Sequence, residues 1–224
     1  MRQIFMFFCL ISCTVSWAQT KIFIGGGLSQ SSFASGTATQ KPFDKTSSSG
    51  LISGLANVQI EKSVFKSYTV FTGLGFNSAR AHISRTGFSS TDERDITIDY
   101  LMIPIGISRK IFTTKAGIGW CSLAGYAAYA ISGIEKGVYT YLNNSPSIIY
   151  NKVQIRSNNP DQSSPTVVVP FDFGLQAEVG FDINRFRICT KYLWGLKGVM
   201  ANPDLYSSQY FNRTFTIALN YQCL

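Results

Sequence analysis

The chain has 224 residues, a formal net charge of +8 and only 14% charged residues, against about 25% in an ordinary soluble domain. Hydrophobic residues make up 45% of it, yet beyond the N-terminal segment no apolar run reaches the ~20 residues that a membrane-spanning helix needs. Lys and Arg are scattered without a basic cluster, an RNA-binding motif or zinc-finger spacing, which argues against a nucleic-acid partner. The composition therefore indicates strands that carry apolar surface in short alternating pieces.

Residues 1–18 have the features of a secretory signal peptide. Arg2 precedes an apolar stretch over 4–12, and Ser16-Trp17-Ala18 forms a small-x-small cleavage motif. The stretch is too short to cross a bilayer. We therefore expect export with cleavage after Ala18, which leaves residues 19–224 as one domain.

The remaining chain divides into about eight segments with period-two alternation, separated by clusters of Gly, Ser, Asn and Pro. The predicted strands are 20–33, 51–61, 67–82, 94–108, 112–130, 166–183, 186–199 and 211–223. The predicted connections are long at 34–50, 84–93, 131–165 and 200–210, and tight at 62–66, 109–111 and 184–185. This asymmetry is typical of outer-membrane barrels, with short periplasmic turns and long extracellular loops. We predict an all-β fold, an eight-stranded antiparallel up-and-down transmembrane β-barrel in the cell outer membrane.

Each strand presents two chemically different faces. In 167–183 the odd positions are apolar or aromatic, and the even positions include Asp172, Glu178 and Asp182. Such alternation fits a membrane barrel with an apolar exterior, or a soluble periplasmic lipocalin-like binding barrel with an apolar interior. The polar face is mainly Gly, Ser, Thr and Asn rather than the Lys/Glu coat of a solvated surface. We therefore expect the apolar face to lie in lipid.

Opposite charges on the polar face predict a register for one hairpin. If Asn184-Arg185 is a two-residue turn, Ile183 pairs with Phe186. The same register sets three acid–base pairs across the hairpin, and a slip of one residue would destroy all three. The predicted pairs are Asp182 with Arg187, Glu178 with Lys191, and Asp172 with Lys197. We expect them to fill and rigidify the lumen.

Four stretches carry a resemblance to a known family. They are YLMIPIGI (100–107), KAGIGWCSLAGY (115–126), FDFGLQAEVGFDI (171–183) and KYLWGLKG (191–198). In order and spacing they resemble the PorT-like outer-membrane β-barrel family of the Bacteroidota. The resemblance implies an eight-stranded barrel in outer-membrane lipid and lipopolysaccharide, inserted by the barrel assembly machinery. This chain departs from such barrels in ending on Leu224 rather than on an aromatic, and Tyr221 is the candidate substitute.

Catalytic and metal-binding motifs are absent from the sequence, so we expect no enzymatic activity, no cofactor and no metal. The single histidine, His82, excludes any site that needs two. His82 and Ser84 are similar to the His-x-Ser pair of lipid A deacylases, with Glu93 or Asp95 as the acid that would orient the imidazole. A lipid A-modifying hydrolase is therefore the enzymatic alternative.

The cysteines do not form a disulfide framework or a zinc site. Cys9 and Cys13 belong to the leader, and Cys121, Cys189 and Cys223 are widely spaced. We expect the last three to be small apolar fillers on strands.

A structural or interaction role through the extracellular loops fits the sequence best. Segments 112–130 and 166–183 exceed the 9–11 residues that a strand needs to cross a membrane. We expect them to project from the membrane and to flank the largest loop, 131–165, which is a candidate surface for a protein partner.

The N-terminal assignment predicts the mass of the mature protein. Leu10-Ile11-Ser12-Cys13 resembles a lipoprotein signal, in which Cys13 would become the lipidated first residue. We expect an intact mass that corresponds to residues 19–224 without a lipid adduct. A mass that begins at Cys13 and carries acyl chains would contradict the assignment.

Overall fold

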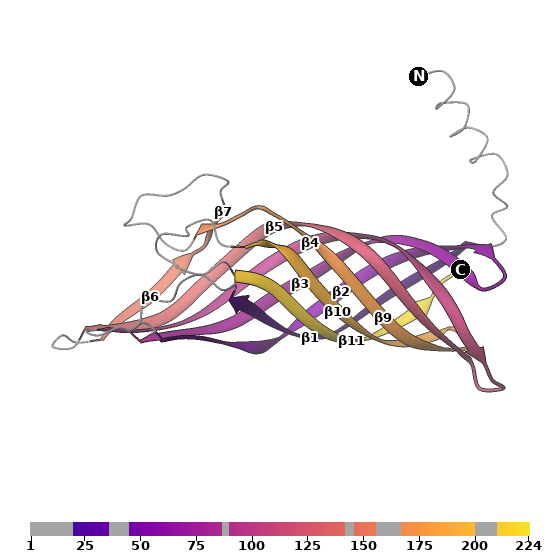
Figure 1. Ribbon diagram of the computed structural model, residues 1–224, viewed down its shortest axis with the longest axis horizontal. Coiled ribbons are helices and arrows are strands. Elements are labelled where there is room, and N and C mark those ends of the chain that lie inside the picture. Colours follow the sequence, from indigo (N-terminus) through magenta and orange to yellow (C-terminus); the bar gives the residue numbers. More distant parts are fainter. Residues whose placement is uncertain (1–19, 36–44, 87–89, 142–145, 156–166, 200–209) are drawn as a thin grey trace, which may run out of the picture.

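A computed structural model describes residues 20–35, 45–86, 90–141, 146–155, 167–199 and 210–224. The predicted signal peptide and Cys13 lie outside these residues. Eight long antiparallel strands close into an elongated barrel (Figure 1). They are β1 (Thr20–Ser35), β2 (Lys45–Phe65), β3 (Tyr68–Thr86), β4 (Ser90–Thr113), β5 (Ile118–Tyr141), β9 (Phe171–Ile183), β10 (Phe186–Gly198) and β11 (Tyr210–Gln222). Within the described ranges, no helix is long and apolar enough to cross a membrane.

The ring is an up-and-down barrel, as the sequence predicts. Each strand pairs with its neighbour in chain order from β1 to β5 and from β9 to β11, while β5 pairs with β9 and β1 closes against β11. Three short strands lie outside the ring. β6 (Ser147–Lys152) forms a hairpin with the upper part of β5, and β7 (Gln154–Ile155) pairs in parallel with β8 (Val167–Val168).

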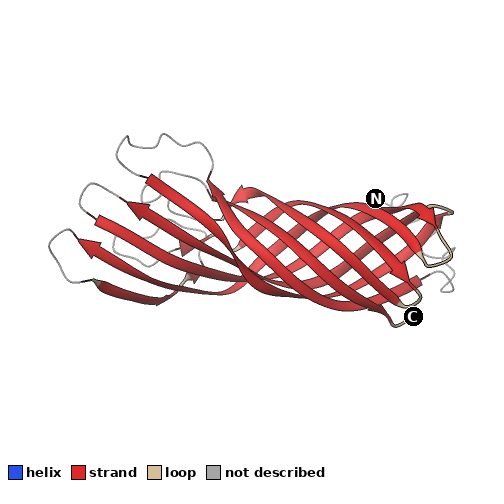
Figure 2. Cartoon of the chain, turned by 90° about the horizontal axis from the view of Figure 1, so that it is seen from below, coloured by secondary structure: helices blue, strands red, loops and turns tan. Residues whose placement is uncertain are grey.

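Short turns gather at one end of the barrel, where the C-terminus also lies (Figures 1 and 2). The predicted turn at Asn184-Arg185 is confirmed, and Asn184 adopts the left-handed conformation, φ 54°, that such two-residue hairpin turns require. The predicted turn at 109–111 is wrong, because β4 continues to Thr113 and the chain reverses over 114–117. Ile111 and Phe112, both exposed apolar residues, extend the strand past the charges that suggested a turn.

The opposite end is longer than the sequence predicts. β4 and β5 each have 24 residues, more than twice the 9–11 needed to cross a membrane. Strands therefore occupy much of the predicted loops 84–93 and 131–165. Figure 2 shows strands that project beyond the closed barrel at the end opposite the short turns, and we call this part the extension.

The seam between the first and last strands depends on glycine. A Cβ atom added to Gly25 would lie 2.1 Å from the side-chain oxygen of Asn220, and one added to Gly27 would lie 2.2 Å from the carbonyl oxygen of Ile217. Any larger residue would force β1 and β11 apart. The run Gly25–Gly27 thus serves close packing, as its place inside a strand predicts.

Candidate functional site: the closed lumen and the strand extension

The lower lumen, near the short turns, is filled by one arginine. The Arg187 guanidinium donates to both carboxylate oxygens of Glu61, with Nη2 3.1 Å from Oε2, and its Nε lies 2.7 Å from Oδ1 of Asp182. Its carbon Cζ lies 3.8 Å from the ring centroid of Phe23 and 4.4 Å from that of Trp120. Two acids and two aromatic faces thus enclose one buried cation, an arrangement that the planar guanidinium suits.

A second buried pair lies further up the lumen. The Lys191 ammonium is 2.8 Å from Oε1 of Glu178, and the Ser122 hydroxyl donates to the other carboxylate oxygen at 3.0 Å. Both charged side chains are almost fully buried, at 7% and 1% exposure. The β9–β10 register sets Glu178 opposite Lys191 and Asp182 opposite Arg187, which is the register that the alternating charges predict.

The third predicted pair, Asp172 with Lys197, does not form in the described structure. The β9–β10 ladder ends at Gly174 and Gly195, before these residues meet, and β10 is irregular between Trp194 and Gly198. Asp172 instead accepts hydrogen bonds from the Tyr126 hydroxyl at 3.2 Å and the Asn212 amide at 3.5 Å. The prediction extended a regular ladder past an irregularity that sequence alternation does not reveal.

Above these polar layers the lumen is closed by an apolar cluster. Inward-facing residues of β3, β4 and β5 pack against residues from the chain between the long strands. The cluster contains Phe33, Ala79, Ala81, Ile83, Ile96, Ile98, Tyr100, Met102, Tyr126, Ala128, Ala130, Val153, Val168, Leu193 and Val199. Val153, Val168 and Val199, all nearly fully buried, come from outside the eight long strands. An interior packed with side chains is typical of barrels of about eight strands.

The outward side chains of β4 are apolar in its lower part and polar in its upper part, and the inward side chains change in the opposite sense. In the lower part the outward side chains are Leu101, Ile103, Ile105 and Ile107, all exposed. In the upper part the outward positions are polar, such as Asp95, while inward Ile96, Ile98 and Tyr100 are fully buried. Apolar-out alternation suits lipid and apolar-in alternation suits water. The exchange of faces on β4 therefore lies between Leu101 and Asp99.

The neighbouring strand β3 changes at the same level. On β3 the outward residues pass from Leu74 and Phe76 to Ser78 and Arg80. On β5 the register shifts beside Ile131, so that the strand alters which positions face inward. A bulge of this kind bends a strand and re-aims its side chains. β3 and β4 thus exchange faces at the same level, whereas β5 keeps the exposed Ile134 and Val138 on its outer face beyond the bulge.

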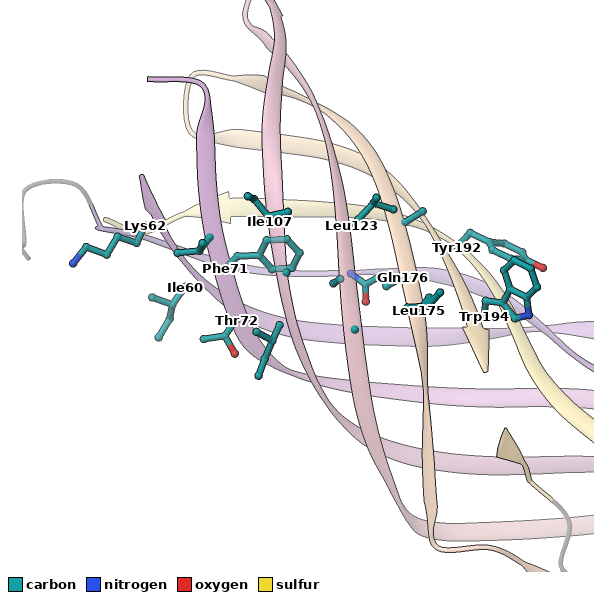
Figure 3. Close-up of a pocket in the computed structure, with 16 residues that line it drawn as sticks. Ile60, Lys62, Phe71, Thr72, Ile107, Leu123, Leu175, Gln176, Tyr192 and Trp194 are labelled. Atoms are coloured by element: carbon teal, nitrogen blue, oxygen red, sulfur yellow. The ribbon is translucent and has the colours of Figure 1, made fainter. Parts of the chain in front are cut away.

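The lipid-facing belt contains one apolar groove. Small exposed residues, Gly125 and Ala177, line it together with the larger Leu123, Leu175 and Trp194, and Figure 3 labels the three larger ones. The groove has a volume of about 870 Å³. Its lining also includes the buried Phe71, Ala124 and Gln176, and its exposed apolar walls offer room for acyl chains.

The predicted catalytic candidates lie on the outer face of the extension. Nδ1 of His82 is 2.8 Å from Oδ1 of Asp95, and the β3–β4 register sets Glu93 opposite Ser84. Among the described residues, Ser84 makes no hydrogen bond to His82, so the structure joins the histidine to an acid but not to the serine. His82 also lies six positions beyond Phe76, the last apolar outward residue of β3, roughly 20 Å along the strand.

Metal ligands and disulfides are lacking in the part of the chain that the structure describes. No group of three His, Cys, Asp or Glu side chains there could hold a metal ion. Cys121, Cys189 and Cys223 are free thiols, and Cys189 is buried on β10.

Residues 17–200 match the family described as outer membrane protein beta-barrel domain. No curated protein shows significant sequence similarity to the chain. Among solved structures, the attachment invasion locus protein Ail of Yersinia pestis is 13% identical, with a TM-score of 0.39, covering 91% of this chain and 99% of that one. The outer membrane protein OprG of Pseudomonas aeruginosa is 9% identical, with a TM-score of 0.43 and coverage of 91% and 95%.

The buried Lys191–Glu178 pair predicts a non-additive pair of mutations. Lys191→Ala leaves the Glu178 carboxylate buried without its partner, which we expect to lower the free energy of unfolding by about 3–5 kcal/mol. The double variant Glu178→Ala/Lys191→Ala removes both charges and should lose less. Urea unfolding in detergent micelles measures both, with Lys197→Ala, which has no described ion pair, as the control. Equal losses in the single and double variants would contradict the pairing.

Proposed function

Because this chain belongs to the outer membrane protein beta-barrel domain family, we propose that it is a non-conducting, non-enzymatic outer-membrane barrel that holds a β-sheet extension outside the cell. The observation that carries the proposal is the exchange of faces along β3 and β4. These two strands have an apolar exterior in the lower part, and a polar exterior over an apolar inner face in the upper part. The barrel then acts as an anchor, and the extension acts as the surface presented to the surroundings.

The division of the sheet into a barrel and an extension also suggests the partners of each part. We infer that the belt contacts outer-membrane lipid and that the extension stands among the lipopolysaccharide. Insertion by the barrel assembly machinery is supported by Tyr221, an outward aromatic near the end of β11. The motifs at 100–107 and 191–198 favour membership of the PorT-like group within the family.

The extracellular side offers one exposed strand for a protein partner. β6 pairs with β5 along one edge only among the described strands. Its side chains Ile148 and Tyr150 are 85% and 66% exposed. An exposed strand edge with apolar side chains is a template for pairing with another chain. We therefore place the interaction surface on the β5–β6 hairpin.

The two alternatives have weaker support. A lipocalin-like binding barrel needs an apolar interior around a ligand, whereas the lower lumen here contains Arg187, Glu61, Lys191 and Glu178. A lipid A-modifying hydrolase is favoured by the His82–Asp95 hydrogen bond. It is disfavoured by the separation of His82 from Ser84 and from the lipid-facing belt.

The filled lumen predicts the absence of conductance. We expect purified barrel inserted in a planar bilayer to show no single-channel steps, because polar pairs and an apolar cluster occupy the lumen in succession. A general porin inserted in the same bilayers provides the positive control. Reproducible steps from this protein would contradict a closed lumen.

The partner surface predicts site-specific crosslinking in cells. A photoreactive amino acid at position 148, on the exposed edge strand, should give a discrete protein adduct at the expected mass of a complex. The matched control is position 217, which is 55% exposed but lies on the lipid-facing side of β11. Adducts at neither position, or equally at both, would rule out the β5–β6 hairpin as the interaction surface.

A further inference from the structure

Five cations surround the end of the barrel that carries the short turns. We propose that these side chains, here called the cation ring, bind the phosphates of anionic phospholipids in the periplasmic leaflet. The ring consists of Lys62, Lys66, Arg109, Lys115 and Arg185. The proposal rests on the proposed function, which places the short turns on the periplasmic side.

The fold brings together residues that are far apart in the sequence. Lys66, Lys115 and Arg185 lie in the three described short turns, after β2, β4 and β9. Lys62 and Arg109 lie on the outer face of β2 and β4, each two positions beyond an exposed isoleucine of the lipid-facing belt. Figure 3 shows Lys62 beside Ile60, directed away from the barrel. The ring therefore follows the lower rim of the belt around several strands.

Aromatic side chains hold two of the cations at the level of the membrane surface. The Arg109 guanidinium carbon lies 5.6 Å from the ring centroid of Tyr68. Arg185 donates from Nη1 to the Tyr221 hydroxyl at 3.2 Å, and Tyr221 packs against Phe186 with ring centroids 5.4 Å apart. Tyrosine and tryptophan mark the headgroup region of membrane proteins, so both guanidinium groups lie at the depth of lipid phosphates.

No described acid neutralises the cation ring. The acids at this end, Glu61 and Asp182, point into the lumen and are both bound by Arg187. At the other end charges occur in pairs, such as Arg80 with Asp95 and Arg94 with Glu135. The positive charge of the chain is thus unbalanced at the turn end, where an external anion would complement it.

The position of the cation ring indicates lipid rather than an acidic protein. Its members continue directly into exposed apolar residues, among them Phe65, Ile111 and Phe112, which no water-soluble partner would cover without also displacing lipid. Basic groups beside an apolar membrane surface attract anionic headgroups, and the attraction accumulates with each Lys or Arg. An anionic phospholipid supplies both the phosphate and the acyl chains that this surface contacts.

The test is lipid selectivity of the folded barrel. Purified protein in neutral detergent is incubated with equal amounts of phosphatidylglycerol and phosphatidylethanolamine carrying the same acyl chains, and native mass spectrometry counts the bound lipids. We expect phosphatidylglycerol to be enriched about fivefold or more. Lys62→Gln/Arg109→Gln/Arg185→Gln should bring the ratio close to one. The matched variant Arg80→Gln/Lys136→Gln/Lys152→Gln, which removes three cations from the extension, should leave the enrichment unchanged.

Several outcomes would overturn the proposal. These are equal binding of the two lipids, enrichment that survives in the cation-ring variant, or displacement of phosphatidylglycerol by an equal concentration of inorganic phosphate, which would indicate a site for the phosphate alone. A heat-shifted band on a denaturing gel shows that each variant is folded. If the triple variant does not fold, Arg109→Gln alone is tested in its place, and Arg109→Lys, which keeps the positive charge, should restore the enrichment. Loss of the heat-shifted band in the wild type would instead contradict the proposed function.

Discussion

Closure of the backbone hydrogen bonds is the constraint on which this structure depends. Hydrocarbon offers no partner for a free N–H or C=O group, so a sheet can cross a membrane only as a closed ring. Here the ring closes where β1 meets β11, and Gly25 and Gly27 allow the two backbones to approach. Once eight strands are closed at this width, the inward side chains must share one narrow lumen.

The narrow lumen explains the chemistry found inside it. Charges in the lower part survive burial because each has a partner at hydrogen-bond distance, as for Arg187 between Glu61 and Asp182. The upper part, which we propose to lie beyond the membrane, contains the apolar side chains that a soluble core would hold. One sheet thereby contains a polar lumen and an apolar cluster in succession.

The two ends of the barrel meet different surroundings and differ in charge. In the extension Arg80 pairs with Asp95 and Arg94 with Glu135 across strands, and the β6 edge remains exposed among the described strands. The turn end collects cations around interfacial aromatics. This division fits an anchor that is attached to lipid from below and offers contacts above.

The sequence by itself determined the fold class and the face directed to lipid, because the alternation of apolar and polar residues is a local property. It also determined the β9–β10 register, because a two-residue turn and complementary charges fix which residues pair. It misplaced the turn at 109–111 and the Asp172–Lys197 pair, since a continued strand and an irregular ladder have no local signature. Only the tertiary structure decided that Val153 and Val168 join the apolar cluster of the long strands. It also gathered scattered cations such as Lys62 and Arg185 into one ring, because an up-and-down topology returns every second connection to the same end.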